Sequence, residues 1–266
     1  MSGKTVLITG AGAGIGRALA IEADRLGHSL ILAGRRAETL RETANALPRP
    51  ARIVEADVTT PEGRRAIREA VAKAGGLDIL INNAGKLVSG GIEALTDPEL
   101  DALVATNIAA PVALTRDLLP ALTARRGQVV NIGSVFGDIA FPYFAPYSAS
   151  KFALRGFSEA LRRELAPRGI AVTYIAPRAT RTAAADNFGA LVGPMAMTLD
   201  DPAAVARHAW RAISARRREQ FPPSRERFFV ALQRLRPQLI DRALAKLAGD
   251  PAVVAAARRN PEAGET

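Results

Sequence analysis

The fold of this chain is decided by the stretch Val6-Leu7-Ile8-Thr9-Gly10-Ala11-Gly12-Ala13-Gly14-Ile15-Gly16. A short apolar run leads directly into a glycine-rich turn, and a segment of helical composition, 17–26, follows and ends before Gly27. Glycines allow a positive φ and let backbone N–H groups approach a pyrophosphate, while a helix N-terminus adds partial positive charge. The stretch therefore predicts a strand, a phosphate-binding turn and a helix. A glycine-rich turn alone is weak evidence, so a merely structural tight turn is the alternative.

Short apolar runs alternate with helical patterns along the rest of the chain. After residues 6–8, strand-like runs lie at 30–33, 52–55, 79–81, 129–132 and 171–175. Such alternation is typical of βαβ units, in which helices cover both faces of a parallel sheet. The fold class predicted is α/β, with a parallel sheet of six or seven strands in one domain over residues 1–222. A helical extension, 223–266, follows.

Two long helices are expected in the second half of the domain. Asp97 and Pro98 are typical of an N-cap and a first-turn proline, and the helix they open is broken or kinked near Pro111. A second helix is predicted over about 147–166, before Pro167. Residues 182–198 lack periodicity, and we expect them to form a mobile loop over the site.

Composition excludes several classes of protein. The chain has 266 residues, of which 48% are hydrophobic, so it can bury a large core without covalent staples. It has no cysteine, and its two histidines lie far apart in sequence, so disulfides and a metal site are not expected. Nowhere do 18 apolar residues run uninterrupted, and no signal peptide is evident. We expect a cytoplasmic location.

The net charge of +10 favours an anionic partner such as a phosphorylated cofactor, nucleic acid or an anionic membrane. Arginines are dense in the last quarter of the chain. They are Arg207, Arg211, Arg216, Arg217, Arg218, Arg225, Arg227, Arg234, Arg236 and Arg242. Because no aromatic platforms or binding motif accompany them, a solvated basic face is favoured and no nucleic-acid partner is expected.

The end of the second strand-like run indicates the cofactor. Dinucleotide-binding proteins that use NAD place an acidic residue there, about 20 residues beyond the glycines, to hold the ribose 2′-hydroxyl. This chain instead reads Ala33-Gly34-Arg35-Arg36. Arginine can pair with a 2′-phosphate, so NADP(H) is preferred, with NAD(H) possible. The alternative is that Arg35 and Arg36 cap a helix or face water.

The pentapeptide Tyr147-Ser148-Ala149-Ser150-Lys151 is the strongest indication of catalysis. Positions i and i+4 share one helix face, so the Lys151 ammonium can approach the Tyr147 hydroxyl and lower its pKa. Such a pair can exchange a proton with an alcohol or carbonyl oxygen. Taken alone, the same spacing also fits an ordinary surface helix face.

The motifs occur together in an order that resembles the short-chain dehydrogenase/reductase family over residues 4–222. The matching segments are the glycine loop, written T-G-x-x-x-G-x-G with Gly10, Gly14 and Gly16, then Asn82-Asn83-Ala84-Gly85, Asn107, Gly133-Ser134 and Tyr147 to Lys151. The resemblance implies a doubly wound Rossmann fold and a nicotinamide cofactor. It also implies a catalytic tetrad of Asn107, Ser134, Tyr147 and Lys151.

The resemblance implies a role for each member of the tetrad. Ser134 hydrogen-bonds the substrate oxygen, and Tyr147 passes the proton. Lys151 binds the nicotinamide ribose and tunes Tyr147, while Asn107 holds a water in the proton path.

The loop and the resemblance together give a set of cofactor-binding residues. They are Gly10, Gly12, Ala13, Gly14, Ile15, Gly16, Arg35, Arg36, Asp57, Val58, Asn83, Ala84, Gly85, Tyr147, Lys151, Pro177 and Thr182. Asp57 is expected to contact the adenine. A plain turn after a strand is the alternative for Asn82 and Asn83. The family carries Pro-Gly after the sixth strand, but this chain has Arg178 after Pro177, which either strains the loop, binds a substrate carboxylate or phosphate, or points to solvent.

Residues 224–247 read as a basic amphipathic helix that Pro237 kinks or divides. Its apolar stripe consists of Phe228, Leu232, Leu235, Leu239, Ala243 and Leu247. Such a helix can lie on an anionic membrane, pack on its own domain, cover the substrate pocket or join a dimer interface. Packing or a contact between subunits is favoured over a membrane, and residues beyond Gly249 are expected to fray at the end.

The function expected is NADP(H)-dependent hydride transfer between nicotinamide and a carbonyl or secondary alcohol. We expect a substrate without heavy charge, because residues 182–198 contain one acidic residue, Asp186, and no basic residue, and a medium-sized apolar ketone, aldehyde or acyl-derived alcohol is favoured. The resemblance implies a homodimer or homotetramer. The alternatives are a non-catalytic NADP(H)-binding sensor or scaffold, and a peripheral membrane reductase of lipid carbonyls.

Overall fold

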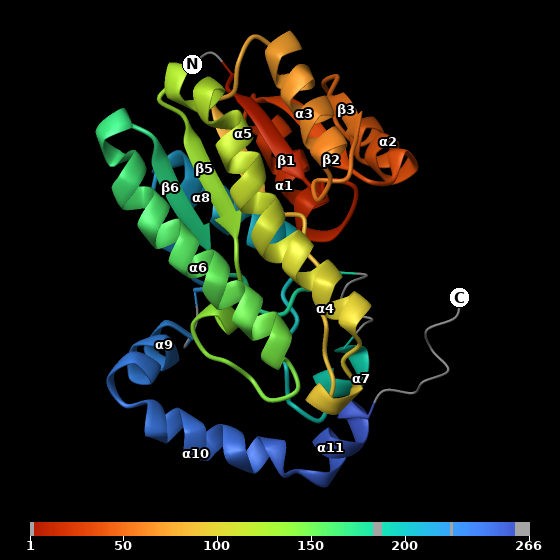
Figure 1. Cartoon of the computed structure of the whole chain (residues 1–266), viewed down its shortest axis with the longest axis vertical. Coiled ribbons are helices and arrows are strands. Elements are labelled where there is room, and N and C mark those ends of the chain that lie inside the picture. The colour runs from red at the N-terminus through yellow and green to blue at the C-terminus, as the bar shows by residue number, and fades with distance from the viewer. Residues whose placement is uncertain (1–2, 183–187, 224–225, 259–266) are drawn as a thin grey trace.

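A single parallel sheet organises the molecule (Figure 1). The computed structural model describes residues 3–182, 188–223 and 226–258. Within them the strands are β1 (Thr5–Thr9), β2 (Ser29–Gly34), β3 (Arg52–Glu55), β4 (Ile79–Asn82), β5 (Gln128–Ile132), β6 (Ala171–Ile175) and β7 (Glu219–Gln220). Their order across the sheet is β3-β2-β1-β4-β5-β6-β7, and every pair is parallel. The predicted α/β class and the doubly wound sheet are confirmed.

Helices cover both faces of this sheet (Figure 1). The described helices are α1 (Gly14–Arg25), α2 (Ala37–Asn45), α3 (Pro61–Lys73), α4 (Asp97–Val104), α5 (Ala110–Ala124), α6 (Ala145–Leu165), α7 (Gly189–Val192), α8 (Pro202–Ser214), α9 (Glu226–Leu235), α10 (Pro237–Ala248) and α11 (Pro251–Ala257). Helices α1 and α8 pack on one face, and α3, α5 and α6 pack on the other.

The position of β1 in the middle of the sheet explains why its sequence is continuously apolar. Val6 and Ile8 face the layer of α1 and α8, whereas Leu7 faces the layer of α3, α5 and α6. All three side chains are fully buried. A strand covered on both faces cannot alternate between apolar and polar residues. Behind it, Trp210 on α8 is buried and its Nε1 donates to the Leu19 carbonyl of α1 at 2.9 Å.

The strand order reverses between β1 and β4. Connections from these two strands leave in opposite directions, and a crevice opens outside their carboxyl ends. The glycine turn follows β1 and the segment 83–85 follows β4, so the fold brings these two predicted cofactor segments to the same edge.

The long helical stretch after β4 differs in detail from the prediction. Its N-cap is Thr96 rather than Asp97, because the Thr96 hydroxyl and the Glu99 side chain form a reciprocal capping box. A π-helical turn at Ala105–Ala109 carries Asn107 and separates α4 from α5, just before Pro111. The predicted break is therefore real, although the wider turn precedes the proline.

By length and composition this stretch, Asp97–Ala124, is apolar enough to cross a membrane, with a mean hydropathy of 1.3. Within the fold its second half packs on α3, β4 and β5, and Leu114, Leu118 and Leu122 are buried. We therefore interpret it as a core helix.

The predicted loop at 182–198 is partly helical. Residues 183–187 lie outside the described part of the chain. Beyond them α7 forms, and Phe188, Leu191 and Met195 are buried against other parts of the protein. The described half of this segment is thus a packed wall rather than an open loop.

The C-terminal extension packs on its own chain, at the end of the molecule toward which the strands point (Figure 1). It divides at Pro237, as the sequence indicates. Polar contacts between its described residues and the domain include Glu226 to Arg178, Arg234 to Asp138, and the Tyr143 hydroxyl to the Ala248 carbonyl at 2.8 Å. Of the residues beyond Gly249, expected to fray, Pro251–Ala257 form α11 with Val253 and Ala257 buried, and 259–266 lie outside the described residues.

Helix α11 should be held to the domain by one apolar side chain. Val253 is fully buried in the apolar cluster that also contains Phe136, Phe144 and Phe188, and burial of a valine contributes about 1.5–3 kcal/mol. We predict that Val253→Asp releases α11 and makes the chain sensitive to limited proteolysis after residue 249. Ala255→Asp, on the exposed side of the same helix, should leave the digestion pattern unchanged. Equal protection of the two variants would show that α11 is not held this way.

Candidate active site

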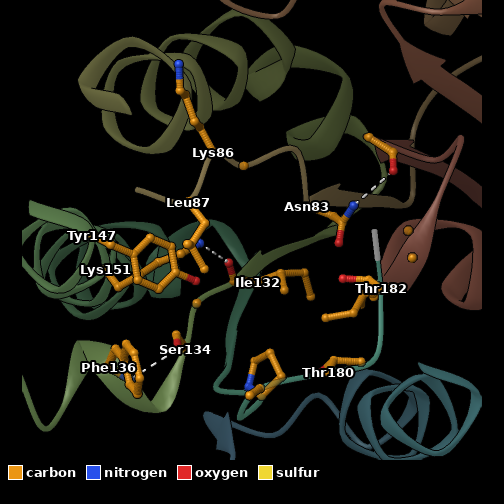
Figure 2. Close-up of a pocket in the computed structure, with 18 of the residues that line it drawn as sticks. Asn83, Lys86, Leu87, Ile132, Ser134, Phe136, Tyr147, Lys151, Thr180 and Thr182 are labelled. Atoms are coloured by element: carbon orange, nitrogen blue, oxygen red, sulfur yellow. Dashed lines mark hydrogen bonds between the residues drawn. The ribbon is translucent and has the colours of Figure 1, made fainter. Parts of the chain in front are cut away.

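A cavity of about 360 Å³ lies at the edge of the sheet where the strand order reverses (Figure 2). Predicted residues that line it are Gly10, Ala13, Gly14, Ile15, Gly16, Arg36, Asn83, Ala84, Gly85, Ser134, Tyr147, Lys151, Pro177 and Thr182. Those that do not line it are Gly12, Arg35, Asp57, Val58 and Asn107. The fold therefore gathers the glycine loop and three members of the tetrad around one space.

The glycine loop at one end of the cavity is held in a shape that favours glycine. Gly10 and Gly14 have φ of 65° and 53°, in the left-handed region. A Cβ at Gly16 would overlap the Gly10 carbonyl and the Asn83 amide. Among the described residues no side chain caps the N-terminus of α1 at Ala13, and its first turn holds no acidic residue. The N–H groups at this helix start suit an anionic group.

Asn82 and Asn83 have different structural tasks. The Asn83 amide donates to the carbonyls of Thr9 and Gly10, at 2.9 and 3.2 Å, and so braces the glycine loop (Figure 2). The Asn82 amide donates instead to Thr115 and Asn131, away from the cavity, and ties β4 to α5 and β5. The segment is more than a plain turn.

Asn107 supports the cavity from outside. Its amide oxygen accepts from the Lys86 N–H and its amide nitrogen donates to the Lys86 carbonyl, both at 2.8 Å. The amide nitrogen also donates to Ser150 Oγ at 2.9 Å. Asn107 thus fixes the backbone beside Gly85, and its role with a water stays a prediction.

Tyr147, Ser134 and Lys151 meet at the other end of the cavity, where the Tyr147 hydroxyl points inward (Figure 2). Helix α6 carries Tyr147 and Lys151, and Lys151 Nζ lies 5.5 Å from the Tyr147 ring centre and donates to the Ile132 carbonyl at 3.1 Å. Ser134 follows β5, and its hydroxyl lies close enough to Tyr147 to affect the pKa of the phenol and accepts from the Phe136 N–H at 3.1 Å.

Burial dominates the titration of this pair. It raises the pKa of Tyr147 to about 12, although the Ser134 hydroxyl acts in the opposite direction. It lowers the pKa of Lys151 to about 8. The expectation that Lys151 lowers the pKa of Tyr147 is wrong in this structure, because desolvation of the phenolate outweighs any attraction to the ammonium.

Arg178 neither binds at the centre of the cavity nor points to solvent. Its guanidinium makes two bonds to Asp200, at 2.7 and 2.9 Å, and a third to Glu226 of α9 at 2.9 Å. Arg178 has no positive φ, so the loop accepts a side chain there without strain. It joins the loop after β6 to the C-terminal extension.

The predicted adenine contact is engaged within its own loop. Asp57 accepts from the Thr59 N–H and hydroxyl, at 2.9 and 2.7 Å. Burial alone would raise the pKa of Asp57, but these bonds and the charge of Arg35 hold it below its usual value. Arg35 therefore lies toward Asp57, whereas Arg36 borders the cavity.

Sequence reasoning missed the apolar wall of the cavity. It is made by Leu87, Phe136, Phe144, Phe188 and Met197. The rings form a continuous group: Phe136 lies 5.1 Å from Phe144 and 6.1 Å from Tyr147, and Phe144 lies 5.8 Å from Phe188. A signal existed, since five of the chain's nine Phe and three Tyr fall between positions 136 and 147.

A family model described as short chain dehydrogenase matches residues 4–190. The chain belongs to the short-chain dehydrogenase family. Two relatives are similar to it. A 3-ketodihydrosphingosine reductase from Bacteroides thetaiotaomicron is 36% identical over 70% of this chain and 68% of the relative. Human estradiol 17-beta-dehydrogenase 11 is 32% identical over 90% of this chain and 81% of the relative.

Two solved structures are also similar to this chain. A short-chain dehydrogenase from Sphingobium yanoikuyae in complex with NADPH is 30% identical, with a TM-score of 0.76 over 90% of this chain and 95% of that one. A 3-ketoacyl-(acyl-carrier-protein) reductase from Brucella melitensis in complex with NADH is 28% identical, with a TM-score of 0.74 over 80% and 91%.

The cavity of this short-chain dehydrogenase fits the nicotinamide dinucleotide that its neighbours hold. The left-handed glycines and the uncapped start of α1 suit a pyrophosphate at one end. Toward the other end, Gly85 lines the cavity near Lys151, and a Cβ there would lie 3.8 Å from Lys151 Nζ. The glycine loop therefore suits the pyrophosphate of an extended dinucleotide, and the end near Lys151 suits its nicotinamide half.

The buried Lys151 should make the stability of this dehydrogenase depend on pH. Its pKa falls from 10.5 in the unfolded chain to about 8 in the folded protein, so the unfolded chain holds the extra proton between these values. Stability therefore rises as pH increases from 8 to 10.5. We predict that the free energy of unfolding of wild type, relative to that of Lys151→Met, increases by about 3 kcal/mol across this pH range. Urea unfolding without cofactor measures this difference. A difference that does not change with pH would contradict the lowered pKa.

Proposed function

We propose that this chain is an NADP(H)-dependent oxidoreductase acting on a carbonyl or secondary alcohol, with Tyr147 as general acid and base. One observation carries the proposal. The Tyr147 hydroxyl, the Ser134 hydroxyl and the Lys151 ammonium face one end of a cavity whose other end is the glycine loop. Such an arrangement can bind a dinucleotide and handle a proton in the same space.

The side chains divide the chemistry between them. When bound, the nicotinamide supplies or accepts the hydride at the substrate carbon. In reduction, the Ser134 hydroxyl donates a hydrogen bond to the carbonyl oxygen and the Tyr147 hydroxyl transfers its proton to the same oxygen. A pKa of about 12 keeps Tyr147 protonated at neutral pH, which suits this role. Lys151, with a pKa of about 8, is mostly charged there and stabilises the tyrosinate that forms.

The wall of the cavity supports an apolar substrate. Its substrate side is formed largely by aromatic and aliphatic side chains, and Arg178, which also lines the cavity, is paired with Asp200 and Glu226. Two relatives are named for 3-ketodihydrosphingosine and for estradiol. A bulky ketone or secondary alcohol therefore fits this pocket better than a charged metabolite.

The preference for NADP(H) rests on Arg36. It is exposed at the border of the cavity, and no carboxylate follows β2 at the position where NAD enzymes bind the 2′-hydroxyl. Structural neighbours bind either cofactor, NADPH in one case and NADH in another, so likeness alone does not distinguish them.

Cofactor binding and turnover test the proposal together. We predict that wild type and Tyr147→Phe bind NADPH equally, followed by nicotinamide fluorescence, whereas only wild type reduces bulky apolar ketones. Arg36→Ala should weaken NADPH binding by about tenfold while changing NADH binding little, as expected for the loss of one charged contact. Failure to bind either cofactor would defeat the proposal. Binding without turnover in wild type would favour a sensor or scaffold instead.

A second candidate, attachment to an anionic membrane, is favoured by the outer face of the extension. Phe228, Leu235 and Leu239 are 66%, 78% and 49% exposed. Exposed cations lie among them along α9 and α10, namely Arg227, Arg236, Arg242 and Lys246. Apolar side chains flanked by cations suit the boundary between headgroups and acyl chains of anionic lipids.

Vesicle sedimentation tests this attachment. We predict that wild type binds vesicles of phosphatidylcholine with 30% phosphatidylserine and is released by 0.5 M salt, about as expected when several cations contribute. The triple variant Phe228→Ser, Leu235→Ser, Leu239→Ser should stay in solution. Ile92→Ser removes an equally exposed side chain elsewhere, at 64% exposure, and should bind like wild type. Binding that is equal in all three proteins, or absent in wild type, excludes this candidate.

A further inference from the structure

The catalytic candidate Ser134 is held in place by a buried tyrosine that no sequence motif singles out. Tyr174 lies on β6, beside β5, and is 1% exposed. Its hydroxyl accepts a hydrogen bond from the Ser134 N–H at 3.3 Å and donates to the Ser134 carbonyl at 3.2 Å. One side chain thus binds both backbone groups of Ser134, whose carbonyl also accepts from the Gly137 N–H at 3.0 Å.

Two glycines make room for this ring. A Cβ on Gly133 would overlap the ring and hydroxyl of Tyr174, and a Cβ on Gly137 would overlap the hydroxyl. The turn that carries Ser134 is therefore shaped around Tyr174. Any shift of the ring must move this turn, because close-packed atoms cannot interpenetrate.

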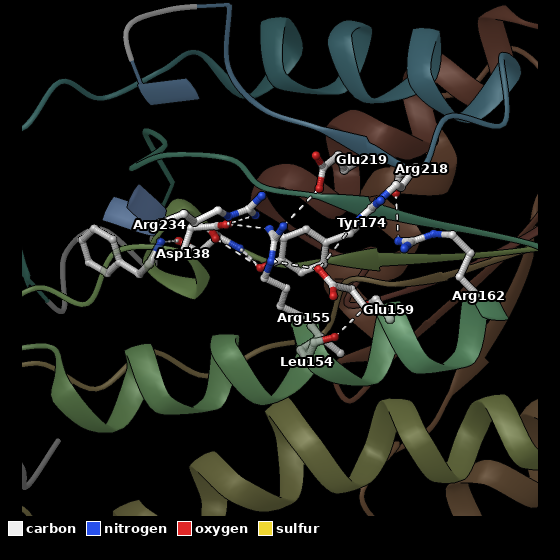
Figure 3. A network of polar contacts seen from close by, with 12 residues as sticks. Asp138, Leu154, Arg155, Glu159, Arg162, Tyr174, Arg218, Glu219 and Arg234 are labelled. Atoms are coloured by element: carbon white, nitrogen blue, oxygen red, sulfur yellow. Dashed lines mark hydrogen bonds and ion pairs between the residues drawn. The ribbon is translucent and has the colours of Figure 1, made fainter. Parts of the chain in front are cut away.

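An ion cluster fixes the other side of the ring (Figure 3). The Arg155 guanidinium stacks over Tyr174, 5.4 Å from the ring centre, and over Phe221 at 5.8 Å. It is also held by Asp138 at 2.7 Å and Glu219 at 3.1 Å. Because Arg155 lies four residues beyond Lys151 on α6, the same helix orients both cations.

The cluster reaches the C-terminal extension. Asp138 is nearly fully buried and binds Arg155 through one oxygen and Arg234 of α9, at 2.9 Å, through the other (Figure 3). Val230 of α9 and Ile240 of α10 belong to the same apolar cluster as Tyr174. The position of α9 is therefore linked to Ser134 through Arg234, Asp138, Arg155 and Tyr174.

We propose that Tyr174 is a positioning residue for Ser134, and that the Arg155–Asp138–Arg234 cluster makes this positioning depend on the C-terminal extension. The inference rests on the proposed function, since it concerns how Ser134 meets the substrate oxygen. Misplacement of a catalytic group by a fraction of an ångström slows the reaction without changing how strongly a remote cofactor group binds.

A double-mutant cycle tests the proposal. Tyr174→Phe keeps the ring and removes the two hydrogen bonds, so we expect kcat to fall about tenfold or more, with KM for the ketone and Kd for NADPH nearly unchanged. In a Ser134→Ala background, Tyr174→Phe should lower kcat by less than about twofold, because the hydroxyl that Tyr174 positions is already absent. Equal effects in both backgrounds, or no effect on wild type, overturn the proposal.

Thr173→Val is the matched control. It removes two hydrogen bonds of a buried hydroxyl on β6, one donated to the Arg217 carbonyl at 2.6 Å and one accepted from the Gln128 amide at 2.9 Å, without touching Ser134. It should lower the melting temperature about as much as Tyr174→Phe and leave kcat near the wild-type value. An equal loss of kcat in both variants would assign the effect to general loosening and reject positioning.

Crystal structures separate this inference from the proposed function. Ser134 Oγ should move away from the Tyr147 hydroxyl in Tyr174→Phe whether or not a substrate has been found, and an unmoved Ser134 rejects the inference. Absence of turnover in wild type rejects the proposed function alone.

Arg234→Gln tests the link to the extension. Arg234 is half exposed, so this variant should fold, release Asp138 on one side and reduce kcat by a smaller factor than Tyr174→Phe. An unchanged kcat would remove the extension from the proposal.

Discussion

The Thr9 hydroxyl joins the two strands between which the sheet reverses its order. It donates to the Ile81 carbonyl and accepts the N–H groups of Asn83 and Ala84, both at 3.0 Å. The Asn83 amide then returns to the carbonyls of Thr9 and Gly10. The glycine loop follows β1, and Gly85 follows β4. Because the Thr9 hydrogen bonds hold the ends of these two strands together, they fix the positions of both segments and of the cavity between them.

Local patterns could predict the elements that local chemistry determines. The run at 6–8 identified β1 because both faces of that strand are buried, and Tyr147 with Lys151 identified one face of α6. The break before Pro111 could be predicted, but not its π-helical form at Ala105–Ala109, where Asn107 binds Lys86, 21 residues away in the chain. The role of Arg178 depends on Asp200 and Glu226, which no spacing rule connects to it. Likewise, the sequence places the cation Lys151 near Tyr147, but it does not reveal that Tyr147 is buried, and this burial raises the pKa of the phenol.

The extension illustrates how a small amount of chain can complete a pocket. Helix α11 contributes Val253 and Ala257 to the cluster that contains Phe136, Phe144 and Phe188. These rings form the wall of the cavity, so α11 supports a site whose lining residues lie between positions 10 and 197. A contact such as that between Tyr143 and Ala248, separated by 105 residues, is invisible to periodicity and motif reasoning.

The single tryptophan of the chain gives this architecture an intrinsic optical reporter. Trp210 is buried between α8 and α1, beside the His28 ring at 5.1 Å, on the helical layer behind the sheet. Its emission therefore follows the integrity of that layer alone. Unfolding that begins in the C-terminal extension would disrupt the pocket while the Trp210 fluorescence is unchanged. A dye that binds exposed apolar surface would therefore detect loss of the pocket first.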